Sequence, residues 1–222
     1  MNARGVLQCD AEVKSSYKKS VSLHFDVNSR EESYAARMLT KSLQERGYVI
    51  NANSGDYSIK FFIDKRGYDA EAFAIIPEGN VIKIIGGDYR GLIYGALSLS
   101  EDLRNEILLD NAVARSEKPK LMLRAVKYDL PWDTYRHSEA LNLHDETCRD
   151  PKYWEAFLDM MAENRLNALS LWNLHPYPFM IIPKNYPEAS PFTKEEFKEW
   201  QKLFQSIIGM AAERAIETYL IP

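Results

Sequence analysis

The N-terminal half of the chain alternates between strand-like and helix-like hydrophobic patterns. Apolar and polar residues alternate over 21–27, as a strand with one buried face requires. Ser29 then begins a capping-box pattern before apolar positions at helical spacing, and Gly47 is placed to end that helix. The same rules predict strands at 57–63, 72–76 and 81–85 and a second helix at 89–104. Together these elements predict a small α+β domain over 21–118, with a mixed or antiparallel sheet and two helices, after a disordered or extended segment at 1–20.

Glycines and a proline mark the turns of this half. The segment Pro77-Glu-Gly-Asn80 predicts a hairpin turn between two of the strands. Gly91 and Gly95 are four residues apart in the second predicted helix, so that helix can lie close to the sheet. The Gly-Gly-Asp run at 86–88 also suits a phosphate loop, but the chain has neither the dinucleotide spacing nor the Lys-Ser/Thr of a P-loop there. Tight packing is therefore preferred, which weakens the alternative of a doubly wound nucleotide-binding enzyme.

From residue 119 onwards the pattern becomes strand, helix, strand, helix, strand. A charged linker at 105–120 precedes a strand that begins at Leu121 and ends before Pro131. The later elements are a polar loop at 133–149, helices starting at 151 and 194, and strands at 168–172 and 217–222. Strands that alternate with helices form parallel βαβ units, so we predict an α/β protein whose residues 119–222 are the first three strands of an incomplete TIM barrel. A last strand at the edge leaves backbone groups unpaired, so we expect a longer natural protein and self-association of this part through its open edge.

Composition and charge narrow the classes of partner. The 222 residues carry a net charge of −4, and the basic residues are scattered, which argues against nucleic acid as a partner. There is no apolar run of about 18 residues, so we expect no membrane span, and no signal peptide is recognisable in the given sequence. This leaves the localisation open, because export remains compatible with residues preceding Met1. Cys9 and Cys148 are too few for a disulfide framework or a thiolate metal site, and we expect no cofactor.

Two motifs carry a family resemblance. The Gly-Gly-Asp turn continues into the helix Tyr-Arg-Gly-Leu-Ile-Tyr-Gly-Ala-Leu-Ser-Leu at 89–99, and Arg124 leads the first strand of the second region. This layout resembles the start of hexosaminidase-type and α-glucuronidase-type glycoside hydrolases, in which a small α+β domain precedes a TIM barrel. The resemblance implies hydrolysis of a glycosidic bond by paired acidic residues after the fourth barrel strand. Those residues would lie beyond residue 222, so no catalytic residue is nominated.

The resemblance and the barrel architecture nominate substrate-binding residues instead. Asp129 follows Arg124 by five residues, as in the first-strand motif of hexosaminidases, but Trp132 stands where that motif has a sugar-binding arginine. This departure argues against an N-acetylhexosamine substrate, although a tryptophan at a strand end is suited to stacking on a sugar ring. Barrel active sites are built from the loops after the strands. The nominated residues are Asp129, Trp132, Arg136, Asn173 and His175.

Each nomination has a plainer alternative. Trp132 also suits a role as a plug at the end of the barrel, and Asp129 can pair with Lys127 or with backbone. Asn173 and His175 can instead anchor their loop. His137 and His144 are spaced too far apart for a compact helical metal-ligand pair. The pair at 145–146, Asp-Glu, is interpreted as a solvated charge pair rather than a catalytic one. The alternative function for the whole chain is a non-catalytic carbohydrate-binding or interaction module.

Overall fold

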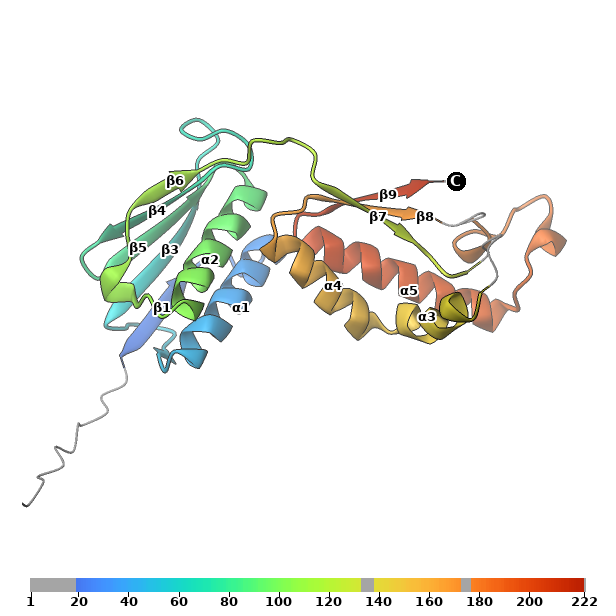
Figure 1. Cartoon of the computed structure of the whole chain (residues 1–222), viewed down its shortest axis with the longest axis horizontal. Helices are drawn as coiled ribbons and strands as arrows, with labels where there is room; N and C mark the ends of the chain where they lie inside the picture. Colours follow the sequence, from blue (N-terminus) through green and yellow to red (C-terminus); the bar gives the residue numbers. More distant parts are fainter. Residues whose placement is uncertain (1–18, 133–137, 173–176, 222) are drawn as a thin grey trace, which may run out of the picture.

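The computed structural model describes residues 19–132, 138–172 and 177–221. It is a mixed α/β structure, as predicted, with two sheets at opposite ends of an elongated molecule (Figure 1). The first sheet has six strands in the order β2-β1-β3-β5-β4-β6, and the second has three in the order β7-β8-β9. The helices α1 and α2 lie on the side of the first sheet that faces the second half of the chain (Figure 1).

The first sheet is built from the N-terminal elements. In chain order these are β1 (Ser20–His24), α1 (Arg30–Glu45), β2 (Val49–Ile50), β3 (Tyr57–Ile63), β4 (Phe73–Glu78), β5 (Val81–Gly86), α2 (Tyr89–Arg104), a 3-10 turn (Leu109–Asn111) and β6 (Arg115–Glu117). Strands β1, β3 and β5 are parallel to one another, whereas β4 runs antiparallel to β5 and β6. The predicted elements are therefore present, but the predicted linker contributes an edge strand, β6, because its residues 115–117 complete the free side of β4.

Two local predictions in this half need correction. Ser29 caps α1 by accepting from the Glu32 amide, but the Glu32 carboxylate accepts from the Asp26 amide at 2.7 Å instead of closing the capping box. Pro77 lies within β4, opposite Ile82. Proline has no N–H to donate, and it is tolerated here because β6 pairs only with the first half of β4 and leaves that side of Pro77 without a partner strand among the described residues. The hairpin turn is therefore shorter than predicted.

The glycines of α2 allow the close packing that the sequence predicts. A Cβ atom added at Gly91 would overlap the carbonyl oxygen of Ala72 and lie 3.0 Å from its carbonyl carbon. At Gly95 the added atom would lie 2.6 Å from the side chain of Ile84 in β5. The Asp88 carboxylate caps α2 by accepting from the Gly91 amide at 2.7 Å. Gly91 and Gly95 thus allow α2 to pack closely on the first half of the chain, as the sequence predicts.

The second sheet consists of three parallel strands joined by helices. Its elements are β7 (Ala125–Asp129), α3 (Glu139–Arg149), α4 (Pro151–Glu163), β8 (Ala168–Trp172), 3-10 turns at Tyr177–Phe179 and Pro187–Ala189, α5 (Lys194–Glu213) and β9 (Glu217–Ile221). Asp150 caps α4 and Thr193 forms a complete capping box on α5, both as predicted. Two predictions are wrong: residues 121–123 are exposed and precede the strand, and the loop at 133–149 contains the helix α3.

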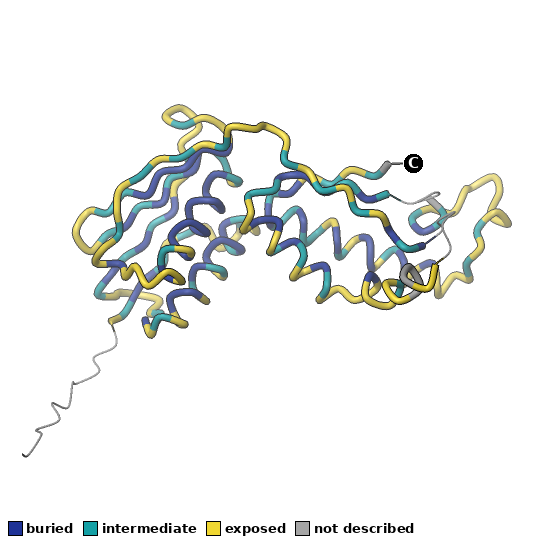
Figure 2. The backbone as a smooth tube through the Cα atoms, in the orientation of Figure 1, coloured by how far each residue is buried: buried dark blue, intermediate teal, exposed yellow. Residues whose placement is uncertain are grey.

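Helices α4 and α5 cover one face of the second sheet, and no helix of the described residues covers the other, which we call the uncovered face (Figures 1 and 2). Leu169 and Leu171 in β8 are buried on the covered face, packed in one core with Trp154 of α4 and Ile207 of α5. Strand β7 alternates between partly buried and exposed residues, as a sheet with one covered face requires. The uncovered face therefore carries the side chains that alternate with this core.

Four helices end in the same hydrogen-bonded turn. After α1, α2, α4 and α5, one residue adopts a positive φ, and its amide and the next amide both bond back to carbonyls of the last helical turn. The four left-handed residues are Gly47, Glu106, Arg165 and Ala215. Only the first is a glycine, the residue that the sequence rule expects at this position.

The two halves meet through helices and buried polar groups. Arg214, at the end of α5, has only 1% of its surface exposed and pairs with Asp159 of α4 at 2.6 Å. Tyr34 of α1 donates to the same carboxylate at 3.0 Å, and the Arg214 guanidinium lies 4.7 Å from the Tyr34 ring centroid. Burial and the nearby Asp159 charge raise the pKa of Tyr34, so its hydroxyl stays a hydrogen-bond donor. The first and second halves are thus joined by the hydrogen bond from Tyr34 to Asp159 and by the contact of Arg214 with the Tyr34 ring.

Candidate functional site

The carboxyl ends of the three parallel strands bring polar and aromatic side chains together on the uncovered face. Asp129 at the end of β7 is in register with Trp172 at the end of β8, and Lys127 lies one alternation earlier on the same side of β7. Leu130 extends the pairing beyond β7 by donating to the Trp172 carbonyl at 2.7 Å. Loops after the carboxyl ends of parallel strands are where barrel enzymes build their sites. We call Lys127, Asp129 and Trp172 the open-face site.

The open-face site joins a cation, an anion and an indole. Lys127 Nζ is 3.1 Å from Asp129 Oδ1 and 4.3 Å from the centroid of the Trp172 ring. The Lys127 and Asp129 side chains are 55% and 61% exposed, so both can also contact a ligand. Carboxylate and ammonium groups bind hydroxyls, and an indole packs on the apolar face of a ring. This combination is chemically suited to a polyhydroxylated ring such as a sugar.

Strand β9 adds a second polar pair on the same face. The Tyr219 hydroxyl donates to the Glu217 carboxylate, and Arg90 of α2 also approaches that carboxylate at 3.3 Å. The hydrogen bond from Tyr219 and then the one from Arg90 lower the pKa of Glu217. The same hydrogen bond raises the pKa of Tyr219, because ionising its hydroxyl would place two negative charges together. Glu217 is therefore ionised at neutral pH and carries no proton to donate.

Trp132 lies in an aromatic cluster and not on the open face. Only 4% of its surface is exposed, and its ring centroid is 4.6 Å from that of Trp200 in α5. Phe179 and Phe204 flank it at 6.2 Å each. The geometry favours the packing alternative for Trp132 over sugar contact, because these aromatic rings already cover the indole. Among the described tryptophans, Trp172 is the one beside Lys127 and Asp129.

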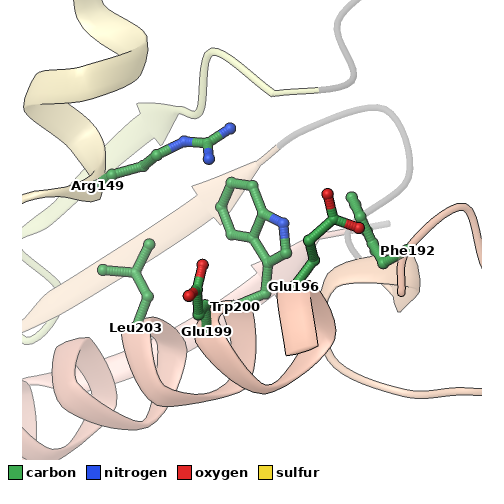
Figure 3. Close-up of a pocket in the computed structure, with 6 residues that line it drawn as sticks. All are labelled: Arg149, Phe192, Glu196, Glu199, Trp200 and Leu203. Carbon is green, nitrogen blue, oxygen red and sulfur yellow. The ribbon is translucent and has the colours of Figure 1, made fainter. Parts of the chain in front are cut away.

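A surface pocket of about 280 Å³ lies on the outer side of this aromatic cluster (Figure 3). The Arg149 guanidinium is 4.4 Å from the Trp200 ring centroid and closes the pocket from the end of α3. Asp145 holds the same guanidinium at 3.2 Å, one helical turn earlier. The other lining residues are Phe192, Glu196, Glu199 and Leu203. The Arg149 guanidinium covers a face of the Trp200 indole that a ligand would otherwise contact. We therefore interpret the pocket as a contact between α3 and α5.

Several predicted residues lie outside the described part of the chain. These are Arg136, Asn173, His175 and His137. The described ranges contain no group of three or more His, Cys, Asp or Glu side chains that could hold a metal ion. Within the same ranges, no helix is long and apolar enough to cross a membrane. Asp145 pairs with Arg149 in the same helix, and the interpretation of 145–146 as a solvated charge pair stays a prediction.

Sequence reasoning nominated Asp129 and missed Lys127 and Trp172 as site residues. Asp129 is on the uncovered face and paired with Lys127, so both of its proposed roles are compatible with its position. The sequence identifies Trp172 only as the last residue of a predicted strand. The alternation in β8 nevertheless predicts the side on which Trp172 lies. Leu169 and Leu171 face the core, so Trp172, the residue after Leu171, lies on the opposite face at the carboxyl end of the strand.

The fold is that of a glycoside hydrolase-like chain, as comparison with solved structures shows. No protein-family model matches it, and no curated protein matches it in sequence. Solved structures do match, and they include glycoside hydrolases of families 138, 84 and 20. Several of these are hexosaminidases, as the sequence resemblance predicts, whereas the α-glucuronidase resemblance stays a prediction.

The similar structures differ in their sequence identity to this chain and in their TM-scores. A GH138 enzyme described as targeting pectin rhamnogalacturonan II has 26% identity and a TM-score of 0.76 over 89% of this chain and 30% of its own. A GH20 exo-β-N-acetylglucosaminidase from Vibrio harveyi has 15% identity and a TM-score of 0.54, over 91% and 32%. A β-N-acetylhexosaminidase from Bacteroides fragilis has 16% identity and a TM-score of 0.55, over 91% and 40%. The chain spans about a third of their length, and the two at lower identity show the fold alone.

Proposed function

We propose that this chain is the N-terminal portion of a glycoside hydrolase-like protein and that its open-face site binds the carbohydrate. The observation that carries the proposal is the grouping of Lys127, Asp129 and Trp172 at the carboxyl ends of adjacent parallel strands. The likeness in fold to glycoside hydrolases of three families supports it. Loop residues after the strands, Asn173 and His175, would extend the same rim.

Each side chain of the open-face site has a role that follows from its chemistry. The Trp172 indole offers a flat apolar surface on which the C–H face of a sugar ring packs. Asp129 accepts hydrogen bonds from sugar hydroxyls, and Lys127 donates to hydroxyl oxygens while it neutralises Asp129. Arg136 would add a planar donor for an oxygen pair. Domain boundaries near residues 20 and 118, with the small α+β domain as an accessory unit, belong to the same proposal.

Hydrolysis requires two carboxyl groups flanking the glycosidic bond, or one acting together with the substrate. Glu217, on the same face, is held ionised by Tyr219 and Arg90 and therefore does not suit the role of a proton donor. We place the catalytic carboxylates in the part of the protein that follows residue 222, in line with the family resemblance. The role of the present chain is then to bind and orient the substrate.

The first substrate to test follows from two observations. The GH138 enzyme similar to this chain is described as targeting pectin rhamnogalacturonan II. Trp132 stands where the hexosaminidase motif has an arginine, which argues against an N-acetylhexosamine. Oligosaccharides from rhamnogalacturonan II are therefore the first probe, and N-acetylglucosamine oligosaccharides are the comparison.

The experiment measures binding and hydrolysis of both probes by the full natural protein and by three variants. Asp129→Asn removes an acceptor that bonds to the sugar, and Trp172→Ala removes the stacking surface. One hydrogen bond to a charged group contributes about 1.5–3 kcal/mol, so Asp129→Asn should weaken binding about 10- to 100-fold. Glu78→Gln is the matched control, because Glu78 forms the same kind of exposed strand pair with Lys83, at 2.8 Å, in the first sheet.

The outcomes separate the competing functions. The proposal is supported if both open-face variants impair hydrolysis and Glu78→Gln leaves it unchanged. Binding without hydrolysis favours the alternative, a non-catalytic carbohydrate-binding module. Sugar binding that is unchanged in both open-face variants, or binding of neither probe by the wild type, contradicts the assignment of the open-face site.

A further inference from the structure

One buried carboxylate contacts the residues that precede two of the three strands of the second sheet. Glu71 lies between β3 and β4 in the first half of the chain, and its side chain is only 12% exposed. Its carboxylate accepts from Arg124, immediately before β7, and from Asn167, immediately before β8, the latter at 2.9 Å. It also accepts from Arg90 of α2 at 2.6 Å. We call Glu71, Arg90, Arg124 and Asn167 the Glu71 cluster.

Arg90 connects the Glu71 carboxylate to the third strand, β9. Its Nε donates to the Ala215 carbonyl at 2.7 Å, two residues before β9, and its Nη2 is 3.3 Å from the carboxylate of Glu217, the first residue of β9. Arg124 makes the equivalent contact one unit earlier, because its Nε donates to the Arg165 carbonyl at 2.6 Å. The Glu71 cluster therefore reaches the amino ends of β7, β8 and β9.

Asn167 completes the connection between neighbouring strands. Its Oδ1 accepts from the Arg124 amide at 2.8 Å, and its Nδ2 donates to the Met122 carbonyl at 2.6 Å as well as to Glu71. Its backbone donates to the Arg124 carbonyl and accepts from the Glu217 amide, at 2.9 and 3.0 Å. One side chain thus spans from the segment before β7 to the Glu71 carboxylate.

The backbone at Glu71 also points to a specific requirement. Its φ is 62°, a left-handed conformation that disfavours residues other than glycine. A glycine here would adopt this conformation at lower cost but would have no carboxylate. Two arginines aimed at one buried site need a counter-charge, since unpaired buried guanidinium groups are costly. The glutamate is therefore explained by its contacts to the second sheet and not by the local turn.

We propose that the Glu71 cluster anchors the amino ends of β7, β8 and β9 to the first sheet, so that the small α+β unit sets the spacing of the second sheet. The two motifs behind the family resemblance, at 89–99 and 124–132, then share one physical role, because each supplies an arginine to Glu71. This inference concerns the assembly of the second sheet and does not depend on sugar binding.

The test is hydrogen exchange on Glu71→Gln, which keeps the shape of the side chain and removes its charge. We expect exchange to become about tenfold faster or more at the amides that start β7, β8 and β9, while the centre of β3 stays within about twofold of wild type. Glu106→Gln is the matched control: Glu106 also has a positive φ, of 66°, and pairs with an arginine, Arg46 at 3.4 Å, but is 83% exposed. That variant should leave all three strand starts unchanged.

Three results would overturn the proposal. One is unchanged exchange at the strand starts in Glu71→Gln, and another is faster exchange confined to residues 69–74. The third is an equal increase across both sheets, which would mean that Glu71 contributes only to global stability. If Glu71→Gln does not fold, Arg124→Lys is measured instead, because it keeps the charge and loses the fork of donors that joins Glu71 to Arg165. Its effect should be confined to β7 and β8.

Discussion

Adding one methyl group at Gly91 should separate α2 from the first sheet. Gly91 lies in the first turn of α2, where its Cα approaches the backbone of residues 71–72. In Gly91→Ala the new Cβ would overlap the Ala72 carbonyl oxygen and lie 3.2 Å from the Glu71 carbonyl carbon. The obstacle is backbone and not the end of a flexible side chain, so α2 or the segment before β4 must move.

The expected magnitude is the balance of two effects. Overpacking of a well-packed site costs about 1–3 kcal/mol, and the overlap with a carbonyl group places this case at the upper end. Replacing a helical glycine by alanine stabilises by about 0.5–1 kcal/mol. The net loss for Gly91→Ala should be about 2 kcal/mol, which for a chain of this length lowers Tm by about 4–8 °C.

The control is a second helical glycine in the same chain. Gly209 lies within α5, and an added Cβ would meet no heavy atom within 4 Å. Gly209→Ala should therefore stabilise by about 0.5–1 kcal/mol. Thermal unfolding followed by circular dichroism compares the two variants with wild type. Equal shifts of Tm in the two variants, or a Gly91→Ala protein as stable as wild type, would refute the close-packing argument.

Two further predictions concern Glu71 and Trp132. Burial raises the pKa of Glu71, but hydrogen bonds from Asn167, Arg124 and Arg90 outweigh it and hold the pKa below its ordinary 4.5. The ionised Glu71 carboxylate therefore stabilises the fold at pH values above 4.5 and loses this effect as the pH falls through its lowered pKa. The charged and titratable groups that face it are Arg90, Tyr94, Arg124 and Glu217. The stability gap between wild type and Glu71→Gln, from urea unfolding, should shrink from pH 6 to pH 3, and a constant gap would exclude this role. Trp132→Ala should cost about 3–5 kcal/mol as a buried aromatic, whereas Trp172→Ala on the open face should cost about 1 kcal/mol or less; a reversed order in urea unfolding would contradict the assignment of Trp132 to packing.

The sequence predicts elements best where both ends of an element are marked. Helix α1 lies between Ser29 and Gly47, as its two end signals predict, and helix α2 and strands β3 and β8 have the predicted bounds. Strand β6 was missed because three residues in a charged segment carry no period, and only the free side of β4 makes them a strand. Helix α3 was assigned to a polar loop, since its exposed residues have little apolar pattern.

The sequence indicates where a candidate site lies but not which residues form it. The carboxyl ends of parallel strands identify where ligands bind, so Asp129 could be nominated. Whether Trp132 or Trp172 faces a ligand depends on how the chain turns after β7, which carries Trp132 under α5 against Trp200. The Glu71 cluster was not predictable, because its members are far apart in the sequence, with Glu71 and Asn167 separated by 96 positions.

The repeated turn at the helix ends bears on how freely the chain can vary. Arg165 and Ala215 occupy the same left-handed position after α4 and α5, and the atom that each offers to an arginine of the Glu71 cluster is its backbone carbonyl oxygen. Every amino acid has that oxygen. Mutational drift at these two positions can therefore preserve the contact, so comparing side chains between distant homologues would overlook one of the connections between the two sheets.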